Sequence, residues 1–514
     1  MSPHATAFEE EEDHHGHTMQ PPLQAGSTAS TQPRSAPTTS PLLRHHPDDD
    51  LHDLICVGFG PASLAIAVAL HDTLEQDQSH LHPQHPKIRF LEKQPHFAWH
   101  AGMLLPGAKM QISFVKDLAT LRNPRSKFTF LNYLHQKGRL VAFTNLGTFL
   151  PQRIEYEDYM RWCAGHFDEV VEYGADVRAV EVGGICPVSG AVDEFRVSYH
   201  DNSTGRTRTL RTRHVVIAAG GKPNIPSSIP NHPRIIHSSQ YATSISRLFP
   251  SSQPPPRSIA VLGAGQSAAE VFNHIPTLFP AAKTSLVIRG AALRPSDDSP
   301  FVNEIFDPDR VDDIYSQSSA VRAKEITRDR ATNYSVVRLE LLEHIYSTLY
   351  TYRIQFHNEQ DWPQRILPHR TVTGIETCSL DENSRSALQL HLDNDSSVYK
   401  SGKPAINTEK EEEVLEVDLL VVATGYLRTT HETLLESLNA LKPSGSNPWT
   451  VRRNYAVEFA QGKVSPQAGV WLQGCNESTH GLSDSLLSIL ASRAGEVVAS
   501  IFGADPCNAQ VEKR

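Results

Sequence analysis

The sequence predicts an α/β protein with two Rossmann-like dinucleotide-binding domains, the second inserted into the first. Two glycine-rich turns, at 58–63 and 263–268, each follow an apolar run of buried-strand type and precede a helical pattern. Two later apolar runs, 214–217 and 418–422, each end in a turn of small residues. They are typical of strands that return to such sheets.

Length and composition exclude several classes of protein. The chain has 514 residues, with 48 Lys+Arg against 58 Asp+Glu and a net charge of −10. No apolar run approaches the roughly 18 residues that a membrane helix needs, and an acidic chain is a poor ligand for phosphate backbones. The six cysteines form no Cys-x-x-Cys pair, which disfavours a zinc ribbon or a dithiol reductase and suits a reducing compartment. We expect no membrane, nucleic-acid or metal partner.

Both ends of the chain are predicted to be tails. Residues 1–50 consist mainly of Ser, Thr, Pro, Gln, His and acidic residues, with too little apolar surface to order the chain, so we predict disorder. The acidic run 9–13 is wrong for a mitochondrial presequence, and no apolar stretch suits a secretory signal. These features favour a cytoplasmic location. Residues 504–514 are interpreted as a C-terminal tail.

The first domain begins at the apolar run 51–57, which we interpret as a buried strand. Gly58 permits a tight turn, and Gly60 lets a pyrophosphate approach the backbone at the N-terminus of the following helix. The third motif position is Ser63 instead of Gly or Ala, which is still small enough for close packing. A second strand ends at Glu92, whose carboxylate can accept hydrogen bonds from ribose hydroxyls. An adenosine without a 2′-phosphate, as in FAD or NAD, fits this acid.

The second domain carries a complete G-x-G-x-x-A motif, 263–268, after the strand-like run 258–262. The next strand, 284–288, ends in Arg289, where NAD enzymes place an acid. Because an arginine can bind a 2′-phosphate at two points, we predict NADPH. Two such units together indicate a flavoprotein that accepts hydride from a nicotinamide. We assign 51–232 and 416–503 to the FAD domain and 233–415 to the NADPH domain.

Unusual strings outside the glycine turns identify a family. They are 97–103, 110–118, 294–304, 331–335, 418–426 and 476–488. In these strings the chain resembles the class B flavoprotein monooxygenases, and more narrowly the N-hydroxylating enzymes that act on ornithine or lysine in siderophore synthesis. The similarity covers about residues 50–503 and is greatest to fungal L-ornithine N5-monooxygenases.

The resemblance implies a reaction and its partners. The enzyme would use FAD, NADPH and dioxygen to convert L-ornithine to N5-hydroxy-L-ornithine through a flavin hydroperoxide, the first step towards hydroxamate siderophores. The transferred oxygen would go to a neutral amine. Family members are commonly homotetramers, so the resemblance implies a homotetramer here.

The resemblance also assigns residues to each ligand. Those implied to bind the substrate are Lys116, Asn303, Asn333 and Ser488. Those implied to contact FAD are Gly58, Gly60, Glu92, Trp99, His100, Gln111, Ser485, Leu486 and Leu487. Those implied to contact NADPH are Gly265, Gln266, Ser267, Arg289, Asn333, Tyr334 and Ser335.

Several alternatives stay open from the residues alone. Lysine N6-hydroxylation differs by one methylene, which is worth only about 1–3 kcal/mol of discrimination. An NADPH oxidase that releases peroxide, or a flavin-bound scaffold without catalysis, would carry the same nucleotide motifs. Oxygenation of ketones or soft heteroatoms ranks lower, because the stretch 235–241 keeps only His237 and Tyr241 of the F-x-G-x-x-x-H signature region of those enzymes.

Overall fold

The computed structural model describes residues 39–76, 83, 85–377, 388–394, 411–445 and 448–503. Its largest sheet has seven strands, in the order β3-β2-β1-β6-β5-β4, with β17 also paired to β6. The strands β3, β2, β1, β6 and β17 are parallel neighbours, whereas β5 and β4 continue the sheet antiparallel. Their bounds are β1 Leu51–Val57, β2 Ile88–Glu92, β3 Val171–Tyr173, β4 Ala175–Ile185, β5 Val192–Asp201, β6 Arg206–Ile217 and β17 Gly469–Leu472.

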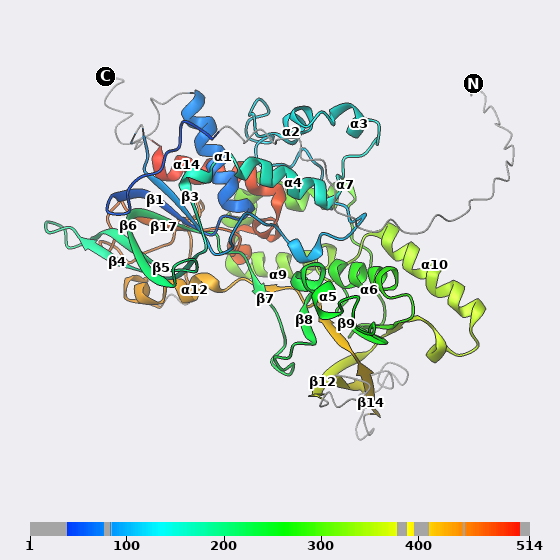
Figure 1. Cartoon of the computed structure of the whole chain (residues 1–514). Helices are drawn as coiled ribbons and strands as arrows, with labels where there is room; N and C mark the ends of the chain where they lie inside the picture. The colour runs from blue at the N-terminus through cyan, green and yellow to red at the C-terminus, as the bar shows by residue number, and fades with distance from the viewer. Residues whose placement is uncertain are drawn as a thin grey trace. The chain divides into compact units, whose positions relative to one another are not determined.

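Helices cover one face of this sheet. The helix α1 (Pro61–Gln76) lies beside α14 (Leu490–Phe502), as Figure 1 shows in blue and red. Residues 63–72 of α1 are all buried, because the helix lies between the sheet, α14 and α4 (Arg153–Ala164), and a helix buried on every side is apolar all round. The two remaining helices of this region are α2 Phe130–Gln136 and α3 Leu140–Thr144.

A second sheet has five parallel strands in the order β11-β10-β9-β15-β8. Alternate side chains of β9 pack against opposite layers: Ile259 and Val261 join the helices α5, α6 and α10, and Ala260 joins a three-stranded antiparallel sheet. The strand bounds are β8 Ile235–His237, β9 Ser258–Leu262, β10 Lys283–Val287, β11 Gln364–Leu367, β12 Arg370–Thr377, β13 Leu388–Asn394, β14 Glu411–Val417 and β15 Leu419–Val422. The helix bounds are α5 Tyr241–Leu248, α6 Gln266–Leu278 and α10 Leu339–Gln355.

Several short elements lie in the segments between the strands and long helices of the two sheets. A two-stranded pair, β7 with β16, joins the two crossing segments of the chain. The bounds of these elements are β7 Lys222–Pro223, β16 Tyr426–Leu427, α7 Pro300–Asn303, α8 Val311–Ser316, α9 Ser319–Asp329, α12 Thr430–Leu434 and α13 Glu477–His480. The insertion of one parallel-sheet unit into another confirms the predicted α/β fold with two Rossmann-like domains. Among the described residues, no helix is both long and apolar enough to span a bilayer.

The structure corrects one domain boundary. The sequence assigned 416–503 to the first domain, but β15 pairs with β8 and β9 and therefore belongs to the five-stranded sheet. A buried apolar strand gives no local sign of which sheet it joins, since both sheets bury such strands on two faces.

The predicted N-terminal tail is also corrected in part. Residues 1–38 and 504–514 lie outside the described part of the chain. Residues 39–50, expected to be disordered, pack on the first domain: Leu43 is 2 % exposed in its core, and Ser40 donates its backbone N–H to the carbonyl of His166 at 2.8 Å. Asp50 pairs with Lys87 at 2.9 Å. Residues 39–50 are therefore ordered by one buried leucine and by ion pairs of their acidic residues, although their composition is typical of a disordered tail.

Candidate active site

The first glycine turn leaves β1 at the carboxyl end of the parallel strands. Gly58 has φ 89°, and a Cβ there would meet the carbonyl oxygen of Ala218, which follows β6, at 2.6 Å. Glycine is therefore required for this close approach. A Cβ at Gly60 would meet no atom within 4 Å. The turn therefore packs tightly against the sheet at Gly58 and leaves free space at Gly60. Such an open cradle of backbone is the kind of site that binds a pyrophosphate.

Glu92 lies next to this turn at the end of β2. Its Oε2 accepts the backbone N–H of Phe59 at 2.7 Å, and its Oε1 accepts that of Gln94 at 2.8 Å. The side chain is buried, and its hydrogen bond to Phe59 holds the backbone of the glycine turn in place. Each carboxylate oxygen keeps a second lone pair, which suits the predicted contact with ribose hydroxyls.

Trp99 and His100 lie between the two domains. The His100 backbone is left-handed, with φ 47°, and its ring contacts Trp99 and Tyr426. The side chain is exposed to water, although many protein groups lie around it. Burial, followed by the charges of Arg153 and Arg428, lowers the pKa of His100 to about 4. The imidazole is therefore neutral at physiological pH.

The second glycine turn leaves β9 in the same way as the first leaves β1. A Cβ at Gly263 would lie 2.4 Å from the carbonyl oxygen of Ala423, which follows β15. The next glycine of the motif, Gly265, lies against the backbone of Ser335, whose own φ is 57°. The structure thus brings together two residues that the sequence assigned to NADPH from distant parts of the chain.

Two further predicted NADPH residues begin α6. Gln266 is held by the protein itself: its Oε1 accepts the backbone N–H of Arg338 and its Nε2 donates to Glu270, both at 2.9 Å. Ser267 is half-buried in the same first turn. The side-chain amide of Gln266 is therefore already hydrogen-bonded to Arg338 and Glu270.

Arg289 follows β10 on the same carboxyl edge. Its side chain is exposed, and no acidic residue in the described part of the chain forms an ion pair with it. An unpaired guanidinium beside a glycine turn fits the 2′-phosphate of NADPH. The open cradle at Gly60 and this cation make the two sites suitable for FAD and NADPH respectively.

The predicted substrate residues converge in part. Nζ of Lys116 lies 3.5 Å from Oδ1 of Asp307, and Oγ of Ser488 donates to the carbonyl of Phe306 at 3.4 Å. Asn303 is the last residue of α7, four positions before Asp307, and its Nδ2 donates to the carbonyl of Asp298 at 2.8 Å. One short segment, 303–307, therefore joins three of the four residues.

Asn333 and Tyr334 belong to a neighbouring group. The Tyr334 hydroxyl donates to the Glu477 carboxylate, which Arg330 also contacts at 3.3 Å. Asn333 is half-buried, and the structure describes no contact between it and Lys116 or Ser488 within the described residues. The fourth substrate residue is thus near the helix α13 and is not joined to the other three.

The loop that carries Lys116 is held by hydrogen bonds within the first domain. The next residue, Asp117, is 2 % exposed, and its carboxylate accepts backbone N–H groups from Ala119 at 2.9 Å and Phe130 at 2.7 Å. Burial raises the pKa of Asp117, and these hydrogen bonds offset part of that rise. The Tyr156 hydroxyl donates to the carbonyl of Lys116 at 3.2 Å. The backbone of Lys116 is therefore held before any ligand binds.

The residues 485–487, predicted to contact FAD, are held by a buried ion pair. Asp484 and Arg493 are 0 and 2 % exposed and lie 2.9 Å apart. This pair ties the start of the segment to α14, and Leu487 packs against the core of the first domain. Gln111, also predicted to contact FAD, is exposed, and within the described residues its amide has no hydrogen-bond partner.

The sequence missed two groups. Asp307 follows the string that the family match singled out, but nothing local marks it as a partner of Lys116. The other group is an ion pair between the domains, in which Arg153 bonds Glu270 at 2.8 and 2.9 Å. Sequence spacing carries no signal for either, because both contacts join residues far apart in the chain.

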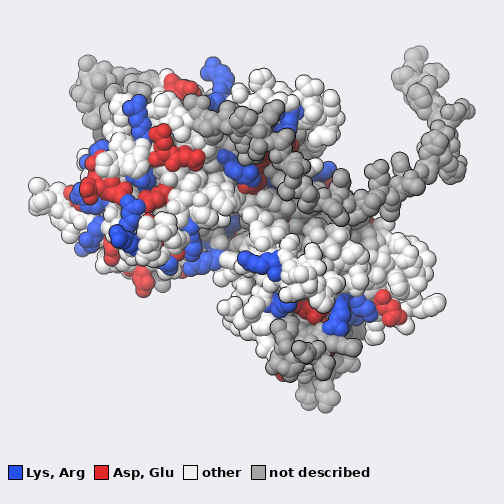
Figure 2. All heavy atoms as spheres, in the orientation of Figure 1, with Lys and Arg blue, Asp and Glu red and all other residues white. Residues whose placement is uncertain are grey.

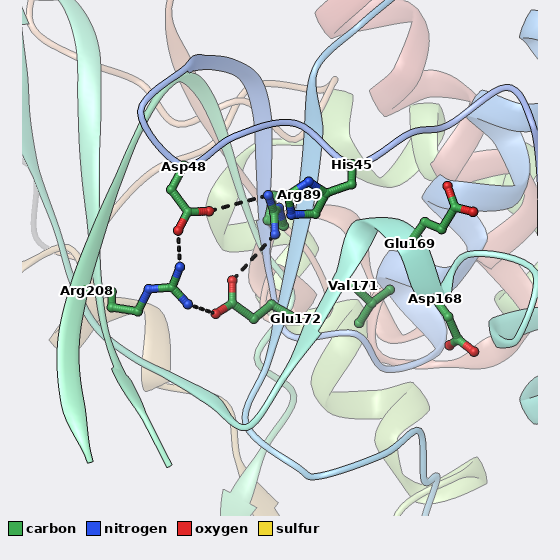
Figure 3. A pocket seen from close by; sticks show the side chains of 8 residues that line it. All are labelled: His45, Asp48, Arg89, Asp168, Glu169, Val171, Glu172 and Arg208. Carbon is green, nitrogen blue, oxygen red and sulfur yellow. Dashed lines mark hydrogen bonds and ion pairs between the residues drawn. The ribbon is translucent and has the colours of Figure 1, made fainter. Parts of the chain in front are cut away.

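A charged cavity of about 510 Å³ lies elsewhere, against β2 and β3. Figure 3 shows that its charges pair with one another: Asp48 contacts Arg89 and Arg208, and Glu172 contacts the same two arginines. Arg89 shares its face of β2 with Leu91, which belongs to the core on the side away from α1. The cavity is therefore not part of the carboxyl edge where the glycine turns lie.

Comparison with known proteins supports one family. A sequence model described as L-lysine 6-monooxygenase/L-ornithine 5-monooxygenase matches residues 50–428. The chain belongs to this family. An L-ornithine N(5)-monooxygenase of Cochliobolus heterostrophus is 54 % identical over 474 residues, which cover 90 % of this chain and 88 % of that protein. This confirms the resemblance inferred from the strings.

Solved structures of the L-lysine 6-monooxygenase/L-ornithine 5-monooxygenase family share the fold. An ornithine hydroxylase from Pseudomonas aeruginosa matches with a TM-score of 0.76 and 34 % identity, over 88 % of this chain and 99 % of that one. An ornithine N-hydroxylase from Kutzneria sp. 744, solved with reduced FAD, NADP⁺ and L-ornithine, matches with a TM-score of 0.75 and 34 % identity over the same shares. The family is one of flavin-dependent monooxygenases, so this chain is an enzyme of that class.

Proposed function

We propose that the protein hydroxylates the side-chain amine of L-ornithine, giving N5-hydroxy-L-ornithine for hydroxamate siderophores, with FAD, NADPH and dioxygen. The observation that carries the proposal is the position of Lys116. Its backbone is fixed, and its ammonium lies at the segment 303–307 that Ser488 also contacts. A fixed cation of this kind can bind the substrate carboxylate and direct the far amine towards the flavin.

Bound FAD and NADPH would supply hydride and oxygen transfer. The chain's own residues position the partners: the cradle at Gly60 and the Glu92 carboxylate hold the flavin nucleotide, while Arg289 and the turn at Gly265 hold the nicotinamide nucleotide. Gln111, whose amide has no partner within the described residues, is left to serve the flavin ring. His100 is neutral and adds no charge beside Trp99 and Tyr426.

The reacting amine must be neutral. An unperturbed alkyl ammonium of this type has a pKa of about 10.4, so the reactive fraction increases as the pH rises from 7 to 9. Activity should increase over the same range. Dioxygen as cosubstrate, the homotetramer and the cytoplasmic location are predictions of the same proposal.

The test measures hydroxylamine product and NADPH oxidation side by side, with FAD-loaded protein and L-ornithine, L-lysine or no amine. Product from ornithine alone, in near one-to-one ratio to NADPH, supports the proposal. Product from lysine would instead make the protein a lysine N6-hydroxylase, since one methylene is a small difference in binding. Equal NADPH consumption in all three tubes, recovered as peroxide, would show an uncoupled oxidase and overturn the substrate assignment.

A further inference from the structure

The helix α10 has an apolar stripe on the side that faces solvent. Its inner side lies beside α6, as Figure 1 shows. Four residues of that inner side pack with the core of the second domain: Leu341, Leu342, Ile345 and Leu349. Four other apolar or aromatic residues are each more than half exposed: Leu339, Tyr346, Tyr350 and Ile354. Because an α-helix has 3.6 residues per turn, these last four share one side of the helix, away from the core. They form what we call the apolar stripe of α10.

The rest of the exposed surface of α10 shows what kind of molecule can cover this stripe. A helix that packs on one core needs only one apolar side, so a second one marks an interaction surface. The remaining side is polar and exposed: Glu340, His344, Thr351 and Gln355. The helix contains two Glu and one Arg, whereas a helix that lies on an anionic membrane is rich in Lys and Arg. The stripe therefore suits a protein partner better than a lipid surface.

Two charged residues beside the stripe have no opposite charge nearby. Glu343 and Arg353 are both exposed on the same side of α10 as Tyr346 and Tyr350. Within the part of the chain that the structure describes, neither forms an ion pair, and the Arg353 guanidinium lies 5.9 Å from the centroid of the Trp362 ring. Ten residues of helix separate Glu343 from Arg353, about 15 Å along the axis. They cannot pair with each other in one copy of the helix.

A second copy of α10 supplies the missing partners. In two antiparallel helices related by a twofold axis at the level of Thr348, Tyr346 of one copy lies opposite Tyr350 of the other, because each is two residues from the axis. Glu343 then lies opposite Arg353, because each is five residues from the axis. A twofold axis makes each contact occur twice. One register therefore pairs the aromatic rings with each other and the acid with the base.

We propose that α10 is a self-association surface, packed antiparallel against α10 of a second copy of this chain. Tyr346 lies against Tyr350 and Glu343 against Arg353. Tyrosine suits such a contact, since its ring gives a large apolar area and its hydroxyl can stay hydrated at the rim. The pairing goes beyond the proposed function and does not depend on it, because none of these four residues is assigned to a nucleotide or substrate site.

The test compares full-length, FAD-loaded wild type with charge variants, by sedimentation velocity over a range of protein concentrations. The variants are Glu343→Arg, Arg353→Glu and the double variant that carries both changes. Thr351→Arg is the matched control, because it adds a cation to the exposed polar side of the same helix. FAD content and circular dichroism are measured for each protein, so that a folding defect is recognised.

Each single charge reversal places like charges opposite each other at both ends of the contact. We expect it to raise the dissociation constant of the pair about tenfold or more, with FAD content and circular dichroism unchanged. The double variant exchanges the two charges, so the wild-type dissociation constant should return. The double variant still lacks the contact of Arg353 with Trp362, so this recovery can come only from the restored charge pairing. Thr351→Arg should associate as the wild type does.

A further variant tests the apolar part of the contact. Tyr346→Ser/Tyr350→Ser removes two exposed rings, so the chain should fold and bind FAD but lose the association through α10. A wild-type dissociation constant in this variant would overturn the proposal.

The charge variants can overturn it in two further ways. Unchanged association in both single variants would place the contact between copies on another surface. Weakened association that the double variant does not restore would show that the antiparallel register is wrong.

The wild type alone can also overturn it. A chain that stays monomeric at every concentration does not use α10 to bind a second copy. If such a monomer floats with phosphatidylserine vesicles, and Tyr346→Ser/Tyr350→Ser does not, the apolar stripe binds a lipid surface instead.

Discussion

Arg153 of the first domain and Glu270 of the second form a two-point ion pair, with nitrogen–oxygen distances of 2.8 and 2.9 Å. Their side chains are 12 and 8 % exposed, and Arg153 also donates to the carbonyl of Met103. Since both charges are largely withdrawn from water, each depends on the other for compensation.

Removing one member of this pair should destabilise the protein strongly. Glu270→Gln leaves Arg153 buried without a countercharge, a change that typically costs about 3–5 kcal/mol. The midpoint of thermal unfolding should fall by several degrees in Glu270→Gln and in Arg153→Met. The double variant should lose less than the sum of the two losses, and strictly additive losses would show that the pair does not couple the domains.

The two glycines of the first turn should respond differently to alanine. Gly58→Ala forces a Cβ to within 2.6 Å of the Ala218 carbonyl at a positive φ, so it should impair folding itself. Gly60→Ala meets no protein atom within 4 Å, so the protein should fold normally and lose only FAD affinity. Circular dichroism and FAD titration of both variants check this. Normal FAD affinity in Gly60→Ala would place the pyrophosphate elsewhere.

Arg289 should decide the preference for NADPH over NADH. Arg289→Met removes the exposed cation after β10 and should raise KM for NADPH about tenfold or more, with little change for NADH. Lys283→Met is the matched control. It also removes an exposed cation of β10, but from the opposite end of the strand, where Nζ of Lys283 donates to the carbonyl of Gln360. A loss of the same size with both nucleotides would assign Arg289 to folding instead of phosphate binding.

Acidification should destabilise the protein partly through His214, a half-buried residue of β6. Burial, and then the charge of Arg213, lowers its pKa to about 4. The unfolded chain, with a His pKa of about 6.5, takes up the proton first as pH falls. The stability contributed by His214 is thus complete above about pH 6.5 and declines towards pH 4, by roughly 3 kcal/mol in all.

Thermal unfolding between pH 7 and 4.5 tests this contribution. The midpoint temperature of His214→Gln should fall less on acidification than that of the wild type. If the midpoint temperature falls equally in both proteins, His214 does not contribute to the pH dependence of stability. Glutamine keeps a polar amide at this position but removes the imidazole ring, whose centroid lies 5.3 Å from that of Trp471, so the variant is compared with the wild type by the change in midpoint with pH and not by its absolute value.

The predictable part of the fold lies in contiguous stretches of chain. The strand, glycine turn and helix of each nucleotide motif are adjacent in sequence, so β1 with α1 and β9 with α6 could be located directly. Arg289 could be located because it follows a strand that follows the motif. Local order in the chain and order in space coincide at these points.

The unpredicted part depends on contacts between distant residues. Lys116 and Asp307 are 191 positions apart, and Arg153 and Glu270 are 117 apart. Neither pair follows from a period or a spacing, because the long-range packing of the two domains creates it. The same holds for β15. Its four apolar residues would suit either sheet, but they pair with β9 in the five-stranded sheet of the inserted domain.

Figure 2 shows basic and acidic side chains intermixed on the face that it draws. Among the ion pairs of the first domain, one joins the first described residues to a buried arginine. The Arg89 guanidinium is 5 % exposed and reaches the His46 carbonyl at 2.5 Å and the Asp48 carboxylate at 3.5 Å. A polypeptide begun at Thr39 retains both contacts. One begun at Leu51, where the first strand starts, would leave Arg89 with Glu172 as its ion-pair partner and would also remove the buried Leu43, so we expect that form to be less stable.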